Sequence, residues 1–491
     1  MNIEYRLAAA VVALMTVAVT FATDIACTPG TLAARLGDAA ATTATLRLNG
    51  SVDASDLFFI DDNMPALRTL DLSEVTVAAY VGAPLRGNSR YAAATIPTGA
   101  LAGAPLTALT LPATPVTLGD MCFSGTKLTT LTVPQSVTFG QGAFAGCPAL
   151  QSVTLYTAGT GDYTFAECSA LRTVALRGTT NAGAHSFAGC TALSTIAGSD
   201  ALTAIGAGAF AGCTSLQVFN FGTSLATIGD RAFTGSGLQY ADLAANRTLR
   251  SVGAHAFADC ADLAEATFGS SPAFGEGAFM GCRSLRTIDM GGDVTIVPDY
   301  AFASSGIADD TGMLPPSTTA VGDYAYSGSR AESVALPSTL TSLGNGAMEN
   351  MTELTLIDGS MLTDVPALGN DVWQGVDQPH VELSVNPDMT DAFRTADQWQ
   401  NFNIQGMSTA NPAITITTGL RGRIADNILY IESSDKDIST VTVYDIDGAI
   451  LAARTVDGTA ASIDLSAVSA PALIVHCVLA DNTAATLKLL R

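Results

Sequence analysis

A phenylalanine, or a Tyr or Met in its place, returns every 21 to 24 residues between positions 123 and 348 of this chain, and a short run of alternating apolar and polar residues follows it. The anchors of this period are Phe123, Phe144, Phe165, Phe187, Phe210, Phe233, Phe257, Phe279, Phe302, Tyr326 and Met348. One phrase recurs around them, as in AFAGCPALQSVTL from Ala143 and AFAGCTSLQVFNF from Ala209. A period of this size indicates a solenoid, in which each unit buries its apolar side by stacking on its neighbours.

Each unit predicts one short strand and one turn. A Leu lies six residues after most anchors, and an alternating run such as LRTVAL from Leu171 is typical of a half-buried strand. Proline ends several of these runs, at Pro112, Pro134 and Pro337, where it cannot continue a hydrogen-bonded ladder. The stacked strands are expected to form a parallel sheet with neighbouring units about 5 Å apart. Anchors, leucines and strand interiors are then the core.

A column of cysteines lies three residues after the anchors: Cys147, Cys168, Cys190, Cys213, Cys260 and Cys282. We interpret it chiefly as a ladder of buried thiols that donate weak hydrogen bonds to inward backbone carbonyls. Disulfides between neighbouring units are the second interpretation, because a spacing of about 5 Å suits a bridge and an exported protein meets oxidants. A metal cluster is the least favoured, since no CxxC spacing occurs.

Acidic residues form a looser column three positions before the anchors: Asp120, Asp162, Asp230, Glu276, Asp299 and Asp323. Carboxylates in successive units could bind a divalent cation or a basic partner. The alternative is a solvated turn position that favours Asp for backbone hydrogen bonding. Tyrosines near the end of the array either contact a ligand or pack in the turns. The possible binding surface is therefore Asp230, Glu276, Asp299, Asp323, Tyr300 and Tyr324.

The two ends of the chain differ from the repeat. Residues 1–22 have the apolar stretch LAAAVVALMTVAV and small residues near a cleavage point, which predicts a secretory signal; a retained membrane anchor is the alternative. Cys27 also suggests a lipid attachment site, but the charged Asp24 disfavours it. After Pro412 the period ends, and ILYIES, VTVYDIDGAIL, ASIDLS, ALIVHCVL and TLKLLR predict a small antiparallel β-sandwich, with Asp447-Gly448 as a hairpin turn.

The repeat resembles the BspA-type leucine-rich repeat family of bacterial surface proteins, through the phrase A-F-x-x-C-x-x-L-x-x-[VI]-x-[LIF] over roughly residues 28 to 405. Ser236, Ser305, Ser329 and Met351 depart from it at the Cys position. The tail resembles the C-terminal sorting domain of type IX secretion cargo, in LYI from Leu429, VYDIDG from Val443, IDLS from Ile463 and the basic ending with Lys488 and Arg491. Pro471-Ala472-Leu473 stands where that domain usually has Gly-Val-Tyr.

We therefore predict a β-rich leucine-rich-repeat solenoid, with one short strand per unit, followed by a small β-sandwich. The expected divisions are 1–22 signal peptide, 23–95 N-terminal cap, 96–356 solenoid, 357–411 C-terminal cap and linker, and 412–491 sorting-type tail. The resemblances imply an exported protein at the cell surface or outside the cell, associated with the outer membrane. They also imply that the C-terminal domain engages the secretion machinery.

Composition narrows the function. A net charge of −23 with only three lysines disfavours nucleic acid as a partner, and no segment after the signal is long enough to span a membrane. No GxSxG, HExxH or Walker sequence occurs, so we expect neither an enzyme nor a cofactor. The leading hypothesis is a binding or adhesion protein whose repeat face contacts host protein, matrix or glycan. The alternative is a structural component of the envelope or surface without a specific host ligand.

Overall fold

A computed structural model describes residues 23–308, 314–406, 420–425, 428–433, 436–444, 450–466, 468, 472–480 and 484–490. The predicted signal segment and the Asp447-Gly448 turn lie outside the described residues. The chain forms two compact units, residues 1–294 with 298–307 and residues 295–297 with 308–491, and each is described by itself. Among the described residues, no helix is long and apolar enough to cross a membrane.

The first unit begins with a capping module. Strands β1 (Thr23–Cys27), β2 (Thr45–Val52) and β3 (Thr69–Val77) pair in parallel, separated by α1 (Leu32–Leu36), the 3₁₀ turn η1 (Gly37–Thr42) and α2 (Ala54–Asn63). Helix α2 starts with a capping box between Asp53 and Asp56, and the buried Asp56 also accepts hydrogen bonds from the backbone N–H groups of Gly30 and Leu32. The Asp56 carboxylate thus connects the start of α2 to the start of α1. Cys27 is buried in β1 rather than displayed.

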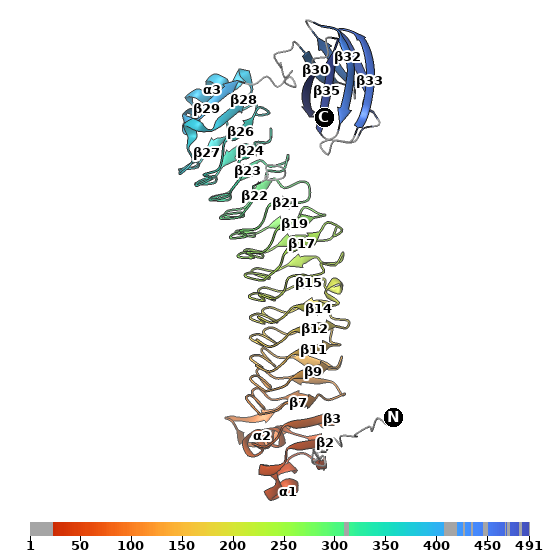
Figure 1. Ribbon diagram of the computed structural model, residues 1–491. Helices are drawn as coiled ribbons and strands as arrows, with labels where there is room; N and C mark the ends of the chain where they lie inside the picture. The colour runs from red at the N-terminus through yellow and green to blue at the C-terminus, as the bar shows by residue number, and fades with distance from the viewer. Residues whose placement is uncertain are drawn as a thin grey trace, which may run out of the picture. The chain divides into compact units, whose positions relative to one another are not determined.

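Two ladders of parallel strands follow in the first unit (Figure 1). The strands after the anchors form the main ladder: β7 (Ala108–Thr110), β9 (Thr130–Val133), β11 (Ser152–Leu155), β12 (Thr173–Leu176), β14 (Thr195–Ala197), β17 (Tyr240–Leu243), β19 (Glu265–Phe268) and β21 (Thr287–Asp289). Short strands before the anchors form the second: β6 (Thr95–Ile96), β8 (Val116–Leu118), β10 (Val137–Phe139), β13 (Asn181–Ala182), β15 (Ala204–Ile205), β16 (Thr227–Ile228), β18 (Ser251–Val252) and β20 (Ala273–Phe274). The sequence predicted one strand after each anchor, which holds for most repeats of the first unit but not after Phe210, where residues 214–221 form no strand and the main ladder is interrupted between β14 and β17. The second ladder was not predicted.

The register of the parallel strands places equivalent residues of successive units opposite one another. Val153 of β11 lies opposite Leu131 of β9 and Val174 of β12, and all three are buried. The anchor rings form a continuous stack inside: from Phe123 to Phe302 each ring lies 5.3–5.7 Å from the next at interplanar angles of 3–16°. Leu101, which the period did not mark, begins the same ladder, because its N–H donates to the carbonyl of Cys122 at 2.8 Å.

The second unit continues the same pattern in its own strands. The short ladder is β22 (Ile296–Val297), β23 (Ala320–Val321), β25 (Ser342–Leu343) and β27 (Ala367–Leu368), and the main ladder is β24 (Ser333–Ala335), β26 (Leu356–Gly359), β28 (Glu382–Val385) and β29 (Asn403–Gly406). Helix α3 (Thr390–Thr395) and the 3₁₀ turns η3 (Gln378–His380), η4 (Pro387–Met389) and η5 (Trp399–Asn401) lie beside the last strands, and η2 (Ser199–Ala201) belongs to the first unit. Tyr326 and Met348 occupy the anchor position and are fully buried, as predicted.

An aromatic cluster closes this part of the second unit. The Trp399 ring lies 5.3 Å from both Trp373 and Phe393, and its Nε1 donates to the carbonyl of Pro366 at 3.1 Å. Because these aromatic side chains are buried, they cover the apolar core at the last strands of the repeat.

The C-terminal residues form two antiparallel sheets. One contains β30 (Leu420–Ala425), β31 (Ile428–Ser433) and β34 (Ala460–Asp464), and the other contains β32 (Ile438–Tyr444), β33 (Ile450–Gly458), β35 (Ala472–Leu479) and β36 (Ala484–Leu490). Buried side chains of both sheets, among them Leu429 and Val475, form one cluster. The five predicted segments all form strands, with VTVYDIDGAIL divided between β32 and β33, and β30 is an addition.

Candidate functional site

Every turn around an anchor holds two residues in the left-handed backbone conformation. In the turn of Phe123, Met121 has φ +55° and Gly125 has φ +69°. The N–H groups of Met121, Phe123 and Gly125 donate to carbonyls of the next turn at 2.8–2.9 Å. Stacking therefore imposes the left-handed conformation, which glycine adopts freely and larger residues adopt at a cost of about 1–2 kcal/mol.

We name these positions by their place relative to the anchor. In the first unit the first left-handed column, two residues before the anchor, contains Gly99, Met121, Gly142, Tyr163, His185, Gly208, Arg231, His255, Gly277 and Tyr300. The second left-handed column, two residues after it, contains Gly103, Gly125, Gly146, Glu167, Gly189, Gly212, Gly235, Asp259, Gly281 and Ser304. Glycine and large residues thus share positions at which the backbone alone favours glycine.

Large side chains in these columns lie along the stack. A Cβ added to Gly142 would come within 2.5 Å of Met121 Sδ, and Cβ atoms at Gly208 and Gly277 would overlap the rings of His185 and His255. Each of these side chains therefore covers a glycine of the following turn. His185 and His255 are half-buried for this reason.

The columns leave a cavity of about 490 Å³ across the turns of Phe123, Phe144 and Phe165. Met121, Ala145, Tyr163 and Ala166 are among the residues that line it. The Tyr163 ring also stacks on His185 of the following turn, with the centroids 4.7 Å apart and an interplanar angle of 17°. Met121 is 47% and Tyr163 39% exposed, so these apolar groups are available to a partner. A volume of this size falls within the usual range for ligand sites.

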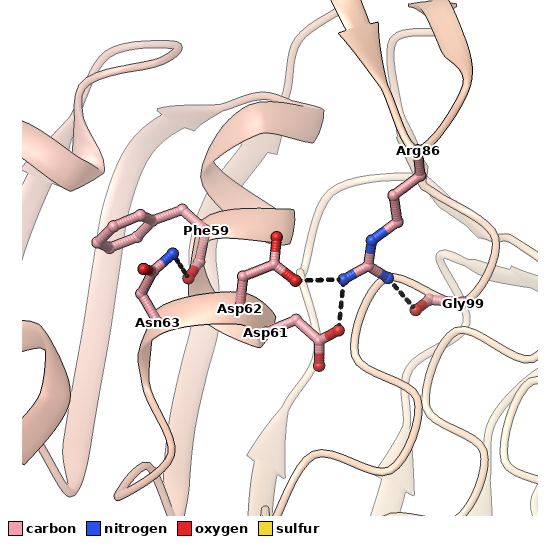
Figure 2. Close-up of polar contacts among 6 residues, drawn as sticks. All are labelled: Phe59, Asp61, Asp62, Asn63, Arg86 and Gly99. Carbon is pink, nitrogen blue, oxygen red and sulfur yellow. Dashed lines mark hydrogen bonds and ion pairs between the residues drawn. The ribbon is translucent and has the colours of Figure 1, made fainter.

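Where the cap joins the repeat, Arg86 is held by carboxylates of α2 and by the Gly99 carbonyl (Figure 2). The hairpin of β4 (Tyr80–Leu85) and β5 (Asn88–Tyr91) carries Arg86 at its turn. Its guanidinium donates to Asp61 and Asp62 at 2.6 and 2.9 Å, donates to the Gly99 carbonyl at 3.0 Å, and lies 4.4 Å from the Phe58 ring centroid. The positive charge of Arg86 is thus already matched by two carboxylates.

The acidic column has a definite structural contact. Asp120, Asp162, Asp230 and Asp323 each accept, through Oδ1, the backbone N–H of the matching residue in the next turn, at 2.7–2.9 Å. Asp230 thereby bonds to Ala254, and Asp323 bonds to Asn345. These carboxylates join successive turns, which accounts for Asp at this position without a bound cation.

The other predicted surface residues are divided between the two units. Glu276 and Asp299 are exposed in the first unit, and their backbone carbonyls accept from His255 and Gly277. Tyr300 belongs to the first left-handed column. In the second unit, Tyr324 is the equivalent residue, and its ring covers Gly346. In the part of the chain that the structure describes, no three His, Cys, Asp or Glu residues are grouped so as to hold a metal.

The cysteine column behaves as the main interpretation predicted. Each Sγ donates to the carbonyl of the anchor in the preceding turn, as from Cys168 to Phe144 at 3.2 Å and from Cys282 to Phe257 at 3.0 Å. The same contact recurs at Cys147, Cys190, Cys213 and Cys260. All six are free thiols and fully buried. Burial raises the pKa of Cys190 to about 12 and that of Cys260 to about 11, so these thiols are poor nucleophiles at neutral pH.

The repeat can be compared with known families at this point. The pattern that defines the BspA type Leucine rich repeat region matches residues 94–200, 180–308 and 310–377, more than half of the chain, in six copies. The chain belongs to the BspA-type leucine-rich repeat family. Comparison with curated proteins gives no match.

Solved structures of other repeat proteins are similar to this chain to different degrees, and one, at a TM-score above 0.5, supports the fold. A leucine-rich repeat protein from Bacteroides ovatus is similar at 18% identity and a TM-score of 0.52, covering 75% of this chain and 85% of that one. A leucine rich cell surface protein from Faecalibacterium prausnitzii is 22% identical, with a TM-score of 0.31 and coverage of 57% and 85%. The pneumococcal vaccine antigen PcpA is 11% identical, with a TM-score of 0.31 and coverage of 74% and 79%. The BspA-type family consists of leucine-rich repeat proteins, and membership is consistent with a protein-binding or surface role.

Proposed function

We propose that this BspA-type protein is exported, displayed at the cell surface and used to bind a host protein, matrix component or glycan through its repeat. The observation that carries the proposal is the set of large side chains in the two left-handed columns. At these positions glycine would satisfy the backbone better, so the side chains have a value that offsets their conformational cost.

The C-terminal sheets complete this proposal. We infer that they form a small β-sandwich that acts as a sorting domain, engages the secretion machinery and leaves the protein outer-membrane associated. The order of the six strands from β31 to β36 and the apolar cluster that the strands of both sheets share, with Leu429 of β31 and Val475 of β35 in it, support a compact module of this kind.

The proposal is tested by measuring where the protein is found in its native cell and where its chain begins and ends. Cells are fractionated, intact cells are treated with protease, and the recovered chain is weighed by intact-mass spectrometry. The proposal expects protease-accessible material that lacks residues 1–22 and the region after Pro412. Full-length protein in the periplasm would refute both the display and the sorting role.

A structural envelope component is the second candidate. The exposed apolar residues Val218 and Tyr240, 65% and 54% accessible, favour it because they could pack against a second copy. Sedimentation velocity over a hundredfold concentration range separates the candidates. Growth of oligomers that Tyr240→Ser abolishes would support assembly, and a monomer at all concentrations would leave binding as the proposed role.

A further inference from the structure

We propose that the cavity between Met121 and Tyr163 binds a cationic side chain, lysine or arginine, of a partner protein. The proposal rests on the proposed binding function only in that the partner is a macromolecule. It assigns the chemical class of the group that enters this cavity.

Charge is the first argument. The charged residues that line the cavity are Asp120 and Glu167, and no basic residue lines it among the described residues. Asp120 uses Oδ1 for the backbone N–H of Gln141. The exposed Glu167 carboxylate lies over Gly189 of the following turn, at the edge of the cavity, and it accepts no hydrogen bond and forms no ion pair within the described part of the chain. Two carboxylates beside one apolar cavity, in a chain of net charge −23, favour a cation and disfavour an anion.

The walls of the cavity are the second argument. Tyr163 has one ring face covered by His185 of the following turn, so the other face is directed to the cavity that it lines. A tyrosine face attracts ammonium and guanidinium groups, and guanidinium also stacks on it. The Met121 thioether is polarisable and adapts to the aliphatic stem of a long side chain.

Backbone conformation is the third argument. The left-handed positions that line the cavity are of two kinds. Met121, Tyr163 and Glu167 carry side chains there at φ +55° to +59°, whereas Gly125, Gly142 and Gly146 leave space. The three residues that bear the disfavoured conformation are therefore the same three that supply the thioether, the aromatic face and the unpaired carboxylate. Their coincidence around one cavity is what distinguishes it from the remaining turns.

Nearby cations do not already satisfy the site. Arg86, which contacts the preceding turn at Gly99, is paired with Asp61 and Asp62. A neutral sugar is a weaker fit, because both charged side chains that line the cavity are carboxylates, and the neutral polar groups are the Ser124 and Tyr163 hydroxyls and the Gln141 amide.

The test uses the full chain and isothermal titration with capped tetra-arginine and tetra-lysine, capped tetra-citrulline as the uncharged control, and cellotetraose as a neutral glycan. We expect both cationic peptides to bind with Kd on the order of 100 μM at low salt, to weaken as salt rises, and citrulline to fail. Glu167→Gln and Tyr163→Gly should each weaken the peptides at least about fivefold. Glu265→Gln removes an equally exposed carboxylate on β19, outside the cavity, and should change Kd less than about twofold.

Three results would overturn the inference. Equal effects of Glu167→Gln and Glu265→Gln would mean diffuse attraction to an acidic protein. Binding of cellotetraose that Tyr163→Gly abolishes, without discrimination between arginine and citrulline, would make the cavity a glycan site. No binding of either peptide would also refute it. Circular dichroism confirms that each variant is folded, and the cellular location measured for the proposed function is independent of all three results.

Discussion

Removing one ring from the anchor stack should destabilise the protein locally and strongly. Phe210 is fully buried between Phe187 and Phe233, whose ring centroids lie 5.5 and 5.4 Å away, and Phe219 contacts its edge at 5.2 Å. Phe210→Ala therefore loses two stacked contacts and one edge contact and leaves a cavity. Truncation of a buried Phe costs about 3–5 kcal/mol, and a ring of this connectivity belongs in the upper half of that range.

Hydrogen exchange read by mass spectrometry is the appropriate assay, because each repeat contacts mainly its neighbours and the loss should be local. We expect amide protection to fall by at least about a hundredfold in the turns around residues 187–233, with a smaller change at the cap, residues 45–77. Val218→Ala, at a residue 65% exposed, is the matched control and should cost less than about 0.5 kcal/mol. Uniform loss of protection along the first unit, or a cost equal to that of Val218→Ala, would refute the description of the interior as a ladder of locally acting rings.

Three further changes test the contacts between turns. Asp230→Ala removes the acceptor of the Ala254 N–H, so the free energy of unfolding should fall by about 1–2 kcal/mol and the Ala254 amide should exchange faster. Asp230→Asn keeps an acceptor oxygen and should retain most of the protection. Unchanged exchange of the Ala254 amide in Asp230→Ala would contradict the contact. Gly142→Ala combines φ +63° with a close approach to the preceding turn, so its thermal midpoint should fall more than that of Gly146→Ala, which has open space; equal falls would contradict the steric account. Burial raises the folded-state pKa of the Cys190 thiol to about 12, against an unfolded value of 9.0. The protonated thiol therefore contributes its full stabilisation below pH 9, and this contribution is lost as pH rises toward 12, at about 1.4 kcal/mol per pH unit. In reducing buffer the thermal midpoint should fall more steeply above pH 9 in the wild type than in Cys190→Ala, and parallel curves would contradict the pKa shift.

The interior of this protein was predictable because its period is strict. A residue that must stack on its counterpart in every turn reveals itself by spacing alone, and Phe144 to Phe302 occupy the interior as the sequence predicts. The thiol contact was predictable for a related reason, because Ser substitutes for Cys at Ser236, which is buried and lies 3.3 Å from Cys260 Sγ.

The contacts between turns were harder to predict. The acidic column was expected to be either a cation site or a solvated turn, but Asp230 bonds to the backbone of the next turn, which depends on the register of stacking. The strands of the second ladder in the first unit are too short, at two or three residues, for an alternating pattern to mark them. The cavity was missed because exchange of Gly for Met121 or Tyr163 becomes informative only when the left-handed backbone is known. In the sequence, the available signal was a position that alternates between glycine and the largest side chains.

The central claim is that inward side chains hold the repeat together while side chains in the left-handed columns are present for a partner. Thermal unfolding of Tyr163→Gly tests it most directly. Glycine removes a left-handed strain of about 1–2 kcal/mol and loses the stack on His185, about 0.5–1.5 kcal/mol, together with the apolar burial of the covered part of the ring. These terms nearly offset one another, so the account predicts a midpoint close to that of the wild type. A fall as large as that of Phe165→Ala would contradict it, because Tyr163 would then be part of the structural stack.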